Sequence, residues 1–399
     1  MCCKRYPINF DLTVGSFPIH SLILGHMQTI DLNLLKELTA IKGEPCISLY
    51  MKTHRQHPES ALDPIAFKKL YKKTLNYIQE HQLTAHEPLL APLEKLIDDK
   101  TFWDNGDNGL AIFCSARGTK ILKLPKDVQE ISCVANSFCV KPLFSFYNEN
   151  QKYYLLALGL DSVKLYQGDK YRIEEVNIEG KIPTSMKEAL GHELTDNHLH
   201  ASVIQGTGLH GYMEKSQEEE IDMDRFFRKI DHAIQEHFDV SKETPLLVAT
   251  LPEHQSHFLR VSKNPHMTLI PLHVNPHALN KDELLERVQE VLMDNFEKHK
   301  KTLLDKSQLA LQENLSSTEL RDVVQDALDG KIDILFIEND RTVNGYIDPE
   351  HRKVQQQKAL STDVINELSC LVFEQGGHVI VLDSDEMLVD TGAFTINRY

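Results

Sequence analysis

Apolar and polar positions in the first third of the chain follow first a helical and then a strand period. Residues 31–40 have the spacing of a helix, and 46–52 form an apolar-rich strand. A second helix is predicted at 64–82, because Asp63 is a suitable N-cap and Pro64 fits the first helical position. Most of its apolar stripe is expected to be formed by Ile65, Leu70, Leu75 and Ile78. Further strands are expected at 109–115, 119–124 and 131–140.

The pattern changes near residue 141, where short apolar runs are joined by tight polar turns. This pattern predicts a three-stranded meander followed by alternating strands and helices, which together favour a mixed sheet covered by helices. The expected strands are 153–158, 163–166, 172–178, 198–204, 246–250 and 267–272, and the expected helices are 218–238 and 252–262.

The last part of the chain predicts a small α/β/α sandwich. A long helix is expected at 279–313, and Ser316 to Glu319 match a capping box that would open a helix at 317–328. Helix 361–375 and strands 332–337 and 378–382 complete the alternation. The chain is therefore expected to be of mixed α/β class, with three domains at 27–140, 141–276 and 277–399 after an extension at 1–26.

Composition narrows the class of protein. The 399 residues are 41% apolar and 26% charged, which is typical of a globular chain and excludes wholesale disorder. No window approaches 18 uninterrupted apolar residues, so no transmembrane helix and no membrane partner are expected. Seven cysteines lie scattered without a CxxC pair, which indicates a reduced, intracellular protein. We expect a soluble, cytoplasmic protein without a cofactor.

Charge is distributed unevenly along the chain. The net charge of −16 argues against extensive non-specific binding to nucleic acid. Residues 1–150 carry about +1, 151–270 about −6 and 271–399 about −11. A local RNA contact is therefore best placed in the N-terminal part, and a solvated helix face is the alternative. The candidate RNA-binding residues are Thr53, His54, Arg55, Lys68, Lys69, Lys72 and Lys73.

The strong catalytic motifs are absent from the sequence, and one region between residues 192 and 213 could hold chemistry. His198 and His200 would share one face of a strand, so with His210 they are candidate ligands of zinc or another transition metal. A polar strand edge beside a loop is the competing interpretation. The following loop contains three glycines, which permit a close approach of the backbone to a partner but are equally typical of a mobile loop.

Taken in order, these segments resemble the bacterial relatives of the archaeo-eukaryotic peptide-chain release factors and Pelota, from about Met27 to Tyr399. The order and spacing of four blocks carry the resemblance. They are 46–50 with 53–55, 102–103 ahead of 108–113, 141–143 entering 153–158, and 224–228 after the glycine loop. The resemblance implies a variable N-terminal domain, an RNase H-like middle domain and a C-terminal domain like the kink-turn-binding ribosomal proteins.

In release factors of this family, a Gly-Gly-Gln loop of the middle domain helps water to hydrolyse the peptidyl-tRNA ester. The equivalent loop lacks this tripeptide here, as it does in Pelota-like relatives. It consists of Gln205, Gly206, Thr207, Gly208, Leu209, His210 and Gly211, and Gln205 precedes the glycines instead of following them. The resemblance therefore implies a non-catalytic, ribosome-associated factor that acts in rescue or hibernation, with RNA as a partner.

Two alternatives stay open on the sequence alone. One is a hydrolase that uses the 192–213 region, either on the peptidyl-tRNA ester or through a bound metal. The other is a protein-interaction module with no role on the ribosome. The charge of the acidic C-terminal domain suits a protein partner, such as a translational GTPase, better than it suits RNA.

Overall fold

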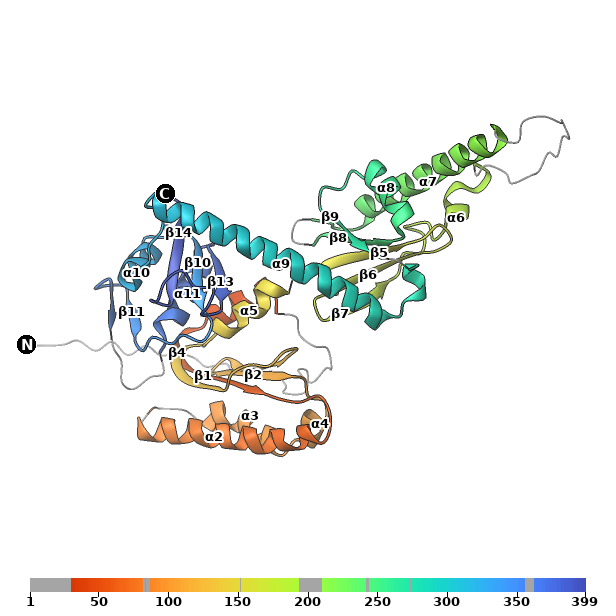
Figure 1. Cartoon of the computed structure of the whole chain (residues 1–399). Helices are drawn as coiled ribbons and strands as arrows, with labels where there is room; N and C mark the ends of the chain where they lie inside the picture. The colour runs from red at the N-terminus through yellow and green to blue at the C-terminus, as the bar shows by residue number, and fades with distance from the viewer. Residues whose placement is uncertain are drawn as a thin grey trace, which may run out of the picture.

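The computed structural model describes residues 30–399 except 82, 84–86, 151, 194–209, 242–243, 273 and 356–361. Within these residues the mixed α/β chain forms three larger sheets, each with its own helices, and one two-stranded sheet (Figure 1). The strand expected at 198–204 lies outside the described residues. Within the described residues, no helix is long and apolar enough to cross a membrane.

The N-terminal unit is a four-stranded antiparallel sheet in the order β3-β2-β1-β4. Its strands are β1 (Lys42–Lys52), β2 (Gly109–Ser115), β3 (Gly118–Leu124) and β4 (Ile131–Ser137), at the predicted places. Its helices are α1 (Leu32–Thr39), α2 (Asp63–Glu80), α3 (Glu87–Ile97) and α4 (Lys100–Trp103). Ile47, Leu49 and Met51 alternate along β1 and pack against α2 and α3 on one face of the sheet.

The start of α2 differs from the prediction in two respects. Ile65 is 66% exposed, because the buried stripe runs through Phe67, Leu70, Tyr71, Thr74 and Ile78. Asp63 is the first residue of the helix rather than its N-cap, and its buried carboxylate accepts hydrogen bonds from His54 instead of from the helix amides.

The opposite face of this sheet shares one hydrophobic core with the C-terminal part of the chain. Cys46, Tyr50 and Phe113 of the sheet belong to the same buried cluster as Leu335 and Leu368. Helix α5 (Lys141–Glu149), which was not predicted, also belongs to this core. We call the N-terminal and C-terminal units together the N–C body.

The middle unit is a five-stranded sheet in the order β7-β6-β5-β8-β9. Strands β5 (Tyr153–Leu158), β8 (Leu246–Thr250) and β9 (Met267–Pro271) are parallel, whereas β6 (Val163–Asp169) and β7 (Arg172–Val176) form an antiparallel hairpin. Helices α6 (Met186–Leu190), α7 (His210–His237) and α8 (Pro252–Val261) belong to this unit. Phe226, Phe227 and Phe258 of α7 and α8 are fully buried against one face of the sheet.

Helix α9 (Lys281–Gln312) spans the middle unit and the N–C body (Figure 1). A capping box between Asn280 and Glu283 begins it. Leu284 and Val288 pack on the middle sheet, whereas Leu303 packs on the C-terminal sheet. At 1.5 Å per residue its length is about 48 Å, and no side chain between residues 293 and 302 is buried.

The C-terminal unit is the α/β/α sandwich that the pattern predicts. Its sheet has the order β13-β10-β14, with β10 (Ile332–Glu338) parallel to β13 (His378–Leu382) and antiparallel to β14 (Ala393–Asn397). Helices α10 (Leu320–Leu328) and α11 (Val364–Glu374) cover one face and α9 the other. A small hairpin, β11 (Tyr346–Asp348) with β12 (Lys353–Gln355), precedes α11.

The capping box predicted at Ser316 to Glu319 is wrong. Helix α10 begins only at Leu320, and its N-cap Glu319 makes no side-chain cap. The residues before it run alongside β14 instead, where the Ser317 amide donates to Thr395 Oγ1 at 3.0 Å and the Thr395 amide donates to the Ser317 carbonyl. Pairing with a strand that lies about 80 residues later therefore displaces the local cap.

Candidate functional site

The loop predicted to be equivalent to the release-factor loop is only partly reached by the described residues. Gln205, Gly206, Thr207, Gly208 and Leu209 lie outside them, as do the candidate metal ligands His198 and His200. His210 and Gly211 are the first residues of α7, but their side chains are not described. Among the residues that are described, no group of three or more His, Cys, Asp or Glu side chains could hold a metal ion.

The block at 224–228, which follows this loop, fixes α7 to α8. The Asp224 carboxylate accepts hydrogen bonds from Arg260 at 2.7 and 2.8 Å and lies 3.0 Å from His257 Nδ1. Burial alone would raise the pKa of Asp224, but these hydrogen bonds hold the pKa below its usual value. Two helical turns later, the Asp231 carboxylate accepts a hydrogen bond from the Ser262 hydroxyl at 2.6 Å. These carboxylates therefore have a structural role.

Two carboxylates shape the loop at residues 53–55, where RNA contact is predicted. Asp63 accepts from the His54 amide and lies 2.8 Å from the ring nitrogen Nδ1 of the same residue. Asp107 accepts from Arg55 Nε at 2.5 Å, and the Asp107 carbonyl accepts from the Thr53 hydroxyl at 2.6 Å. Thr53 is buried and positions the loop, whereas the Arg55 side chain is 53% exposed and can reach a ligand.

The four candidate lysines all lie exposed on the outer side of α2, which faces away from the rest of the molecule (Figure 1). Lys73 forms an ion pair with Glu130 at 3.3 Å. Within the described part of the chain, no ion pair involves Lys68, Lys69 or Lys72. Asp63 joins the His54 loop to the first turn of α2, the helix that carries the four lysines.

Two exposed apolar side chains extend this surface and were not predicted as part of it. Leu62 is 63% exposed and lies just before α2, and Ile65 lies three residues later on the same outer face as Lys69. We call Leu62, Ile65 and the four lysines the α2 face. The one sequence signal for these exposed apolar side chains is the position of Ile65, which does not share the helical spacing of the buried residues of α2.

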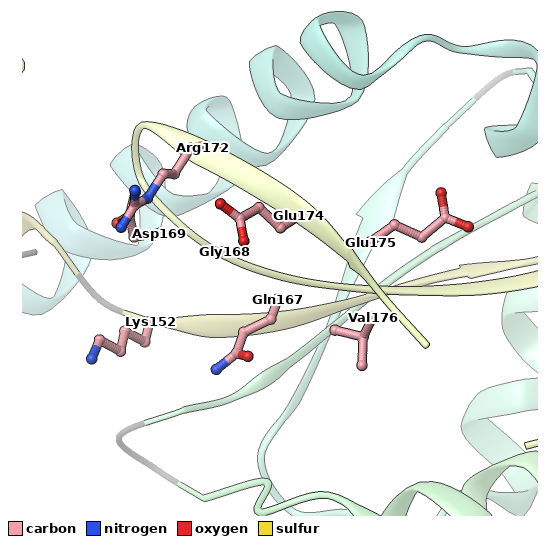
Figure 2. A pocket seen from close by; sticks show the side chains of 8 residues that line it. All are labelled: Lys152, Gln167, Gly168, Asp169, Arg172, Glu174, Glu175 and Val176. Atoms are coloured by element: carbon pink, nitrogen blue, oxygen red, sulfur yellow. The ribbon is translucent and has the colours of Figure 1, made fainter. Parts of the chain in front are cut away.

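A groove of about 380 Å³ lies along the β6–β7 hairpin of the middle unit (Figure 2). Its lining residues are Lys152, Gln167, Gly168, Asp169, Arg172, Glu174, Glu175 and Val176. The charges are largely paired, since Arg172 lies 3.6 Å from Asp169 and Lys152 lies 3.6 Å from Asp31 of the N–C body. Mixed, mutually paired charges of this kind do not form a catalytic constellation.

The middle of the chain carries the family match. Residues 152–331 match the family described as bacterial archaeo-eukaryotic release factor family 3. This segment, a little under half of the chain, is similar to the archaeo-eukaryotic release factors. This relation groups it with translation-related factors and confirms the resemblance over the matched segment. No curated protein matches the chain.

Solved structures of release factors and Pelota proteins show a distant likeness to this chain. The archaeal translation termination factor aRF1 is 16% identical over 92% of this chain and 96% of its own, with a TM-score of 0.22. Archaeoglobus fulgidus Pelota is 11% identical over 92% of both chains, with a TM-score of 0.32. S. cerevisiae Dom34 is 13% identical over 70% of this chain and 73% of its own, with a TM-score of 0.35. These TM-scores are too low to support an argument about arrangement or function.

The matched segment of this chain does not include the whole candidate site. It begins beside β5 and ends just after α10, so it contains the 205–211 loop and the groove. The 53–55 loop and the α2 face lie before it. Their role in RNA contact therefore stays a prediction that rests on exposure and charge.

Proposed function

We propose that this chain is a non-catalytic factor that occupies ribosomes in the cytoplasm, in rescue or hibernation. The observation that carries the proposal is the family match over 152–331 together with a loop, 205–211, that lacks Gly-Gly-Gln. A release factor needs that tripeptide to promote ester hydrolysis. A relative without it is suited to occupying the ribosome rather than to releasing the peptide.

The α2 face supports a contact with ribosomal RNA. Three lysines without an ion pair among the described residues, Lys68, Lys69 and Lys72, lie within two turns of one helix. The first 150 residues carry about +1, while the rest of the chain is acidic. A phosphate backbone therefore meets least repulsion on this side of the molecule.

The acidic C-terminal part supports a protein contact instead. Residues 271–399 carry about −11, a charge that repels an RNA backbone. We therefore assign this part to a protein partner, such as a translational GTPase that accompanies the factor.

Co-sedimentation with ribosomes from growing and starved cells, across a salt series, tests the proposal. The informative variant replaces Lys68, Lys69 and Lys72 by Gln. The matched control replaces Lys281, Lys301 and Lys306, three exposed lysines of α9, by Gln. Each lost phosphate contact lowers the slope of log affinity against log salt by roughly 0.7 to 0.9. We expect the α2 variant to lose at least about tenfold in affinity and up to roughly 2.1 to 2.7 units of slope.

The possible results distinguish ribosome occupancy through the α2 face from an effect of net charge and from an interaction module without a ribosome role. Wild-type binding to ribosomes that weakens with salt, together with an unchanged α9 control, would support ribosome occupancy through the α2 face. Equal loss in both variants would mean that only net charge matters. No ribosome binding at any salt would exclude the occupancy role and favour an interaction module.

A further inference from the structure

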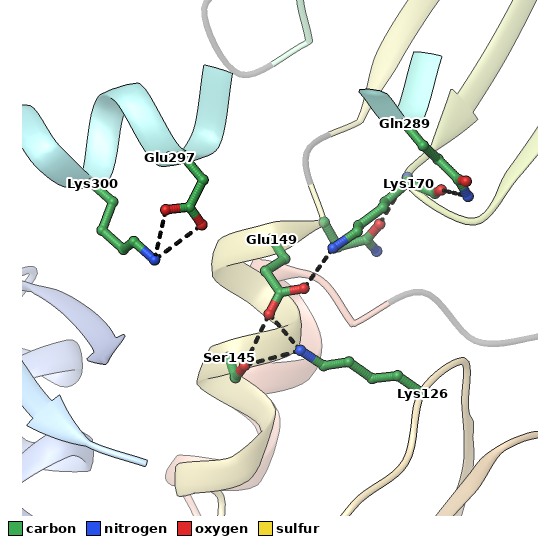
Figure 3. A network of polar contacts seen from close by, with 8 residues as sticks. Lys126, Ser145, Glu149, Lys170, Gln289, Glu297 and Lys300 are labelled. Carbon is green, nitrogen blue, oxygen red and sulfur yellow. Dashed lines mark hydrogen bonds and ion pairs between the residues drawn. The ribbon is translucent and has the colours of Figure 1, made fainter. Parts of the chain in front are cut away.

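The tip of the β6–β7 hairpin is held by groups from outside the middle sheet (Figure 3). Lys170, at this tip, places Nζ 2.7 Å from Glu149 Oε2 at the end of α5. The Lys170 amide donates to Asn150 Oδ1 at 3.2 Å, and Gln289 of α9 donates to the Lys170 carbonyl at 2.7 Å. One residue of the middle unit is thus bound by the linker on one side and by α9 on the other.

Glu149 is in turn anchored inside the N–C body. Its Oε1 accepts from Lys126 Nζ and, at 3.2 Å, from the Ser145 hydroxyl, and Lys126 also lies 5.1 Å from the centre of the Phe146 ring. The side chains of Glu149 and Lys170 are only 16% and 14% exposed. Burial alone would raise the pKa of Glu149, but the two lysines lower it, so the carboxylate is charged at neutral pH. Charge-assisted hydrogen bonds with this little exposure are stronger than surface ion pairs.

The rest of the boundary between the middle unit and the N–C body has few contacts that could fix their relative orientation. Within the described residues, the two buried clusters of the middle sheet contain no residue of the N–C body. The chain crosses the boundary between Asn150 and Lys152 and again in α9, where no residue of 293–302 belongs to a buried hydrophobic cluster. The second ion pair across the boundary, Lys152 with Asp31, is longer at 3.6 Å and more exposed.

We propose that the contact of Lys170 with Glu149 is a releasable latch that fixes the orientation of the middle unit on the N–C body. When it opens, the middle unit turns about the two places where the chain crosses the boundary, next to Asn150 and in the centre of α9. Helix α7 begins at the far end of the middle unit from this latch (Figure 1), so a small rotation at the hairpin tip displaces its N-terminal end most. The latch does not depend on ribosome binding, and the two proposals can fail separately.

Small-angle X-ray scattering of the full chain tests the latch with two matched variants. Lys170→Met keeps the aliphatic stem but removes the charge that crosses the boundary. Lys164→Met removes the same charge from a lysine of the same hairpin, whose ion pair with Glu175 lies entirely within the middle unit. We expect K170M to increase the maximum dimension and radius of gyration relative to wild type, and K164M to leave both unchanged. Circular dichroism checks that the helices and sheets persist.

Three results would overturn the proposal. One is a K170M profile that superimposes on wild type, and another is an equal expansion of K170M and K164M, which would make the effect general. If K170M does not fold, Glu149→Gln replaces it, since it keeps the size and removes the same ion pair. A folded E149Q with a wild-type profile at both low and high salt would be the third contradicting result.

Discussion

At the scale of single residues, buried polar groups in this chain mostly hold elements together. Asp63 and Asp107 each hold a loop, and Asp224 and Asp231 each fix α7 to α8. His254 is an exception, because it is buried while its Nδ1 has no hydrogen-bond partner among the described residues. Its ring lies against that of Phe227, with 6.0 Å between the ring centroids, and Glu253 and His257 are its titratable neighbours. Such a histidine favours its neutral form.

A pH dependence of stability follows from His254. Burial lowers the pKa of His254 in the folded protein below the ordinary histidine value of about 6.5. Its contribution to stability is therefore fully present above that value and is lost as the pH falls through the folded pKa. We expect the melting temperature to fall between pH 7 and pH 5, and His254→Phe to reduce that fall. The exposed His232, changed to Phe, is the control and should leave the pH profile as in wild type. A profile of H254F equal to that of wild type would contradict this assignment.

At the scale of elements, regular patterns were predicted well and remote partnerships were not. The strands of the meander and the long helix α9 lie where their periods indicate. Helix α5 was missed because its start at Lys141-Pro142 depends on a residue far away in sequence. The Asn366 side chain accepts from the Val140 and Lys141 amides at 2.8 and 2.9 Å and donates to the Phe138 carbonyl at 3.1 Å. No local pattern contains that information.

Asn366 should accordingly stabilise the N–C body far more than its size suggests. Asn366→Ala leaves two buried amides and one carbonyl without a partner, each costing roughly 1–3 kcal/mol. We expect a loss of at least about 2 kcal/mol in the free energy of unfolding, measured by urea denaturation. Asn76→Ala, on the exposed side of α2, is the matched control and should change stability by less than about 0.5 kcal/mol. Similar losses in both variants would refute the role of Asn366.

At the scale of the whole molecule, buried apolar contacts join the N-terminal unit to the C-terminal unit. The N-terminal sheet and the C-terminal sandwich share one buried core, and the middle unit is attached to them through a polar junction. The basic helix of the candidate site could be predicted from its run of lysines. The carboxylates that shape its neighbouring loop and the groove on the hairpin could not, because each is formed by strands or turns that meet only in the fold.

The middle unit includes the first half of α9, because this part of the helix covers one face of the middle sheet. Leu284, Val288 and Leu292 pack there against Leu155 and Leu247. A fragment of residues 152–276 loses that cover, whereas 152–296 keeps it. Each buried aliphatic side chain contributes roughly 1.5–3 kcal/mol. We therefore expect the longer fragment to unfold cooperatively at a higher urea concentration, and the shorter one to be destabilised or aggregated. Val288→Asp in the longer fragment should abolish the difference, because a charge cannot be buried against the sheet. Equal stability of the two fragments would mean that α9 belongs energetically to the N–C body alone.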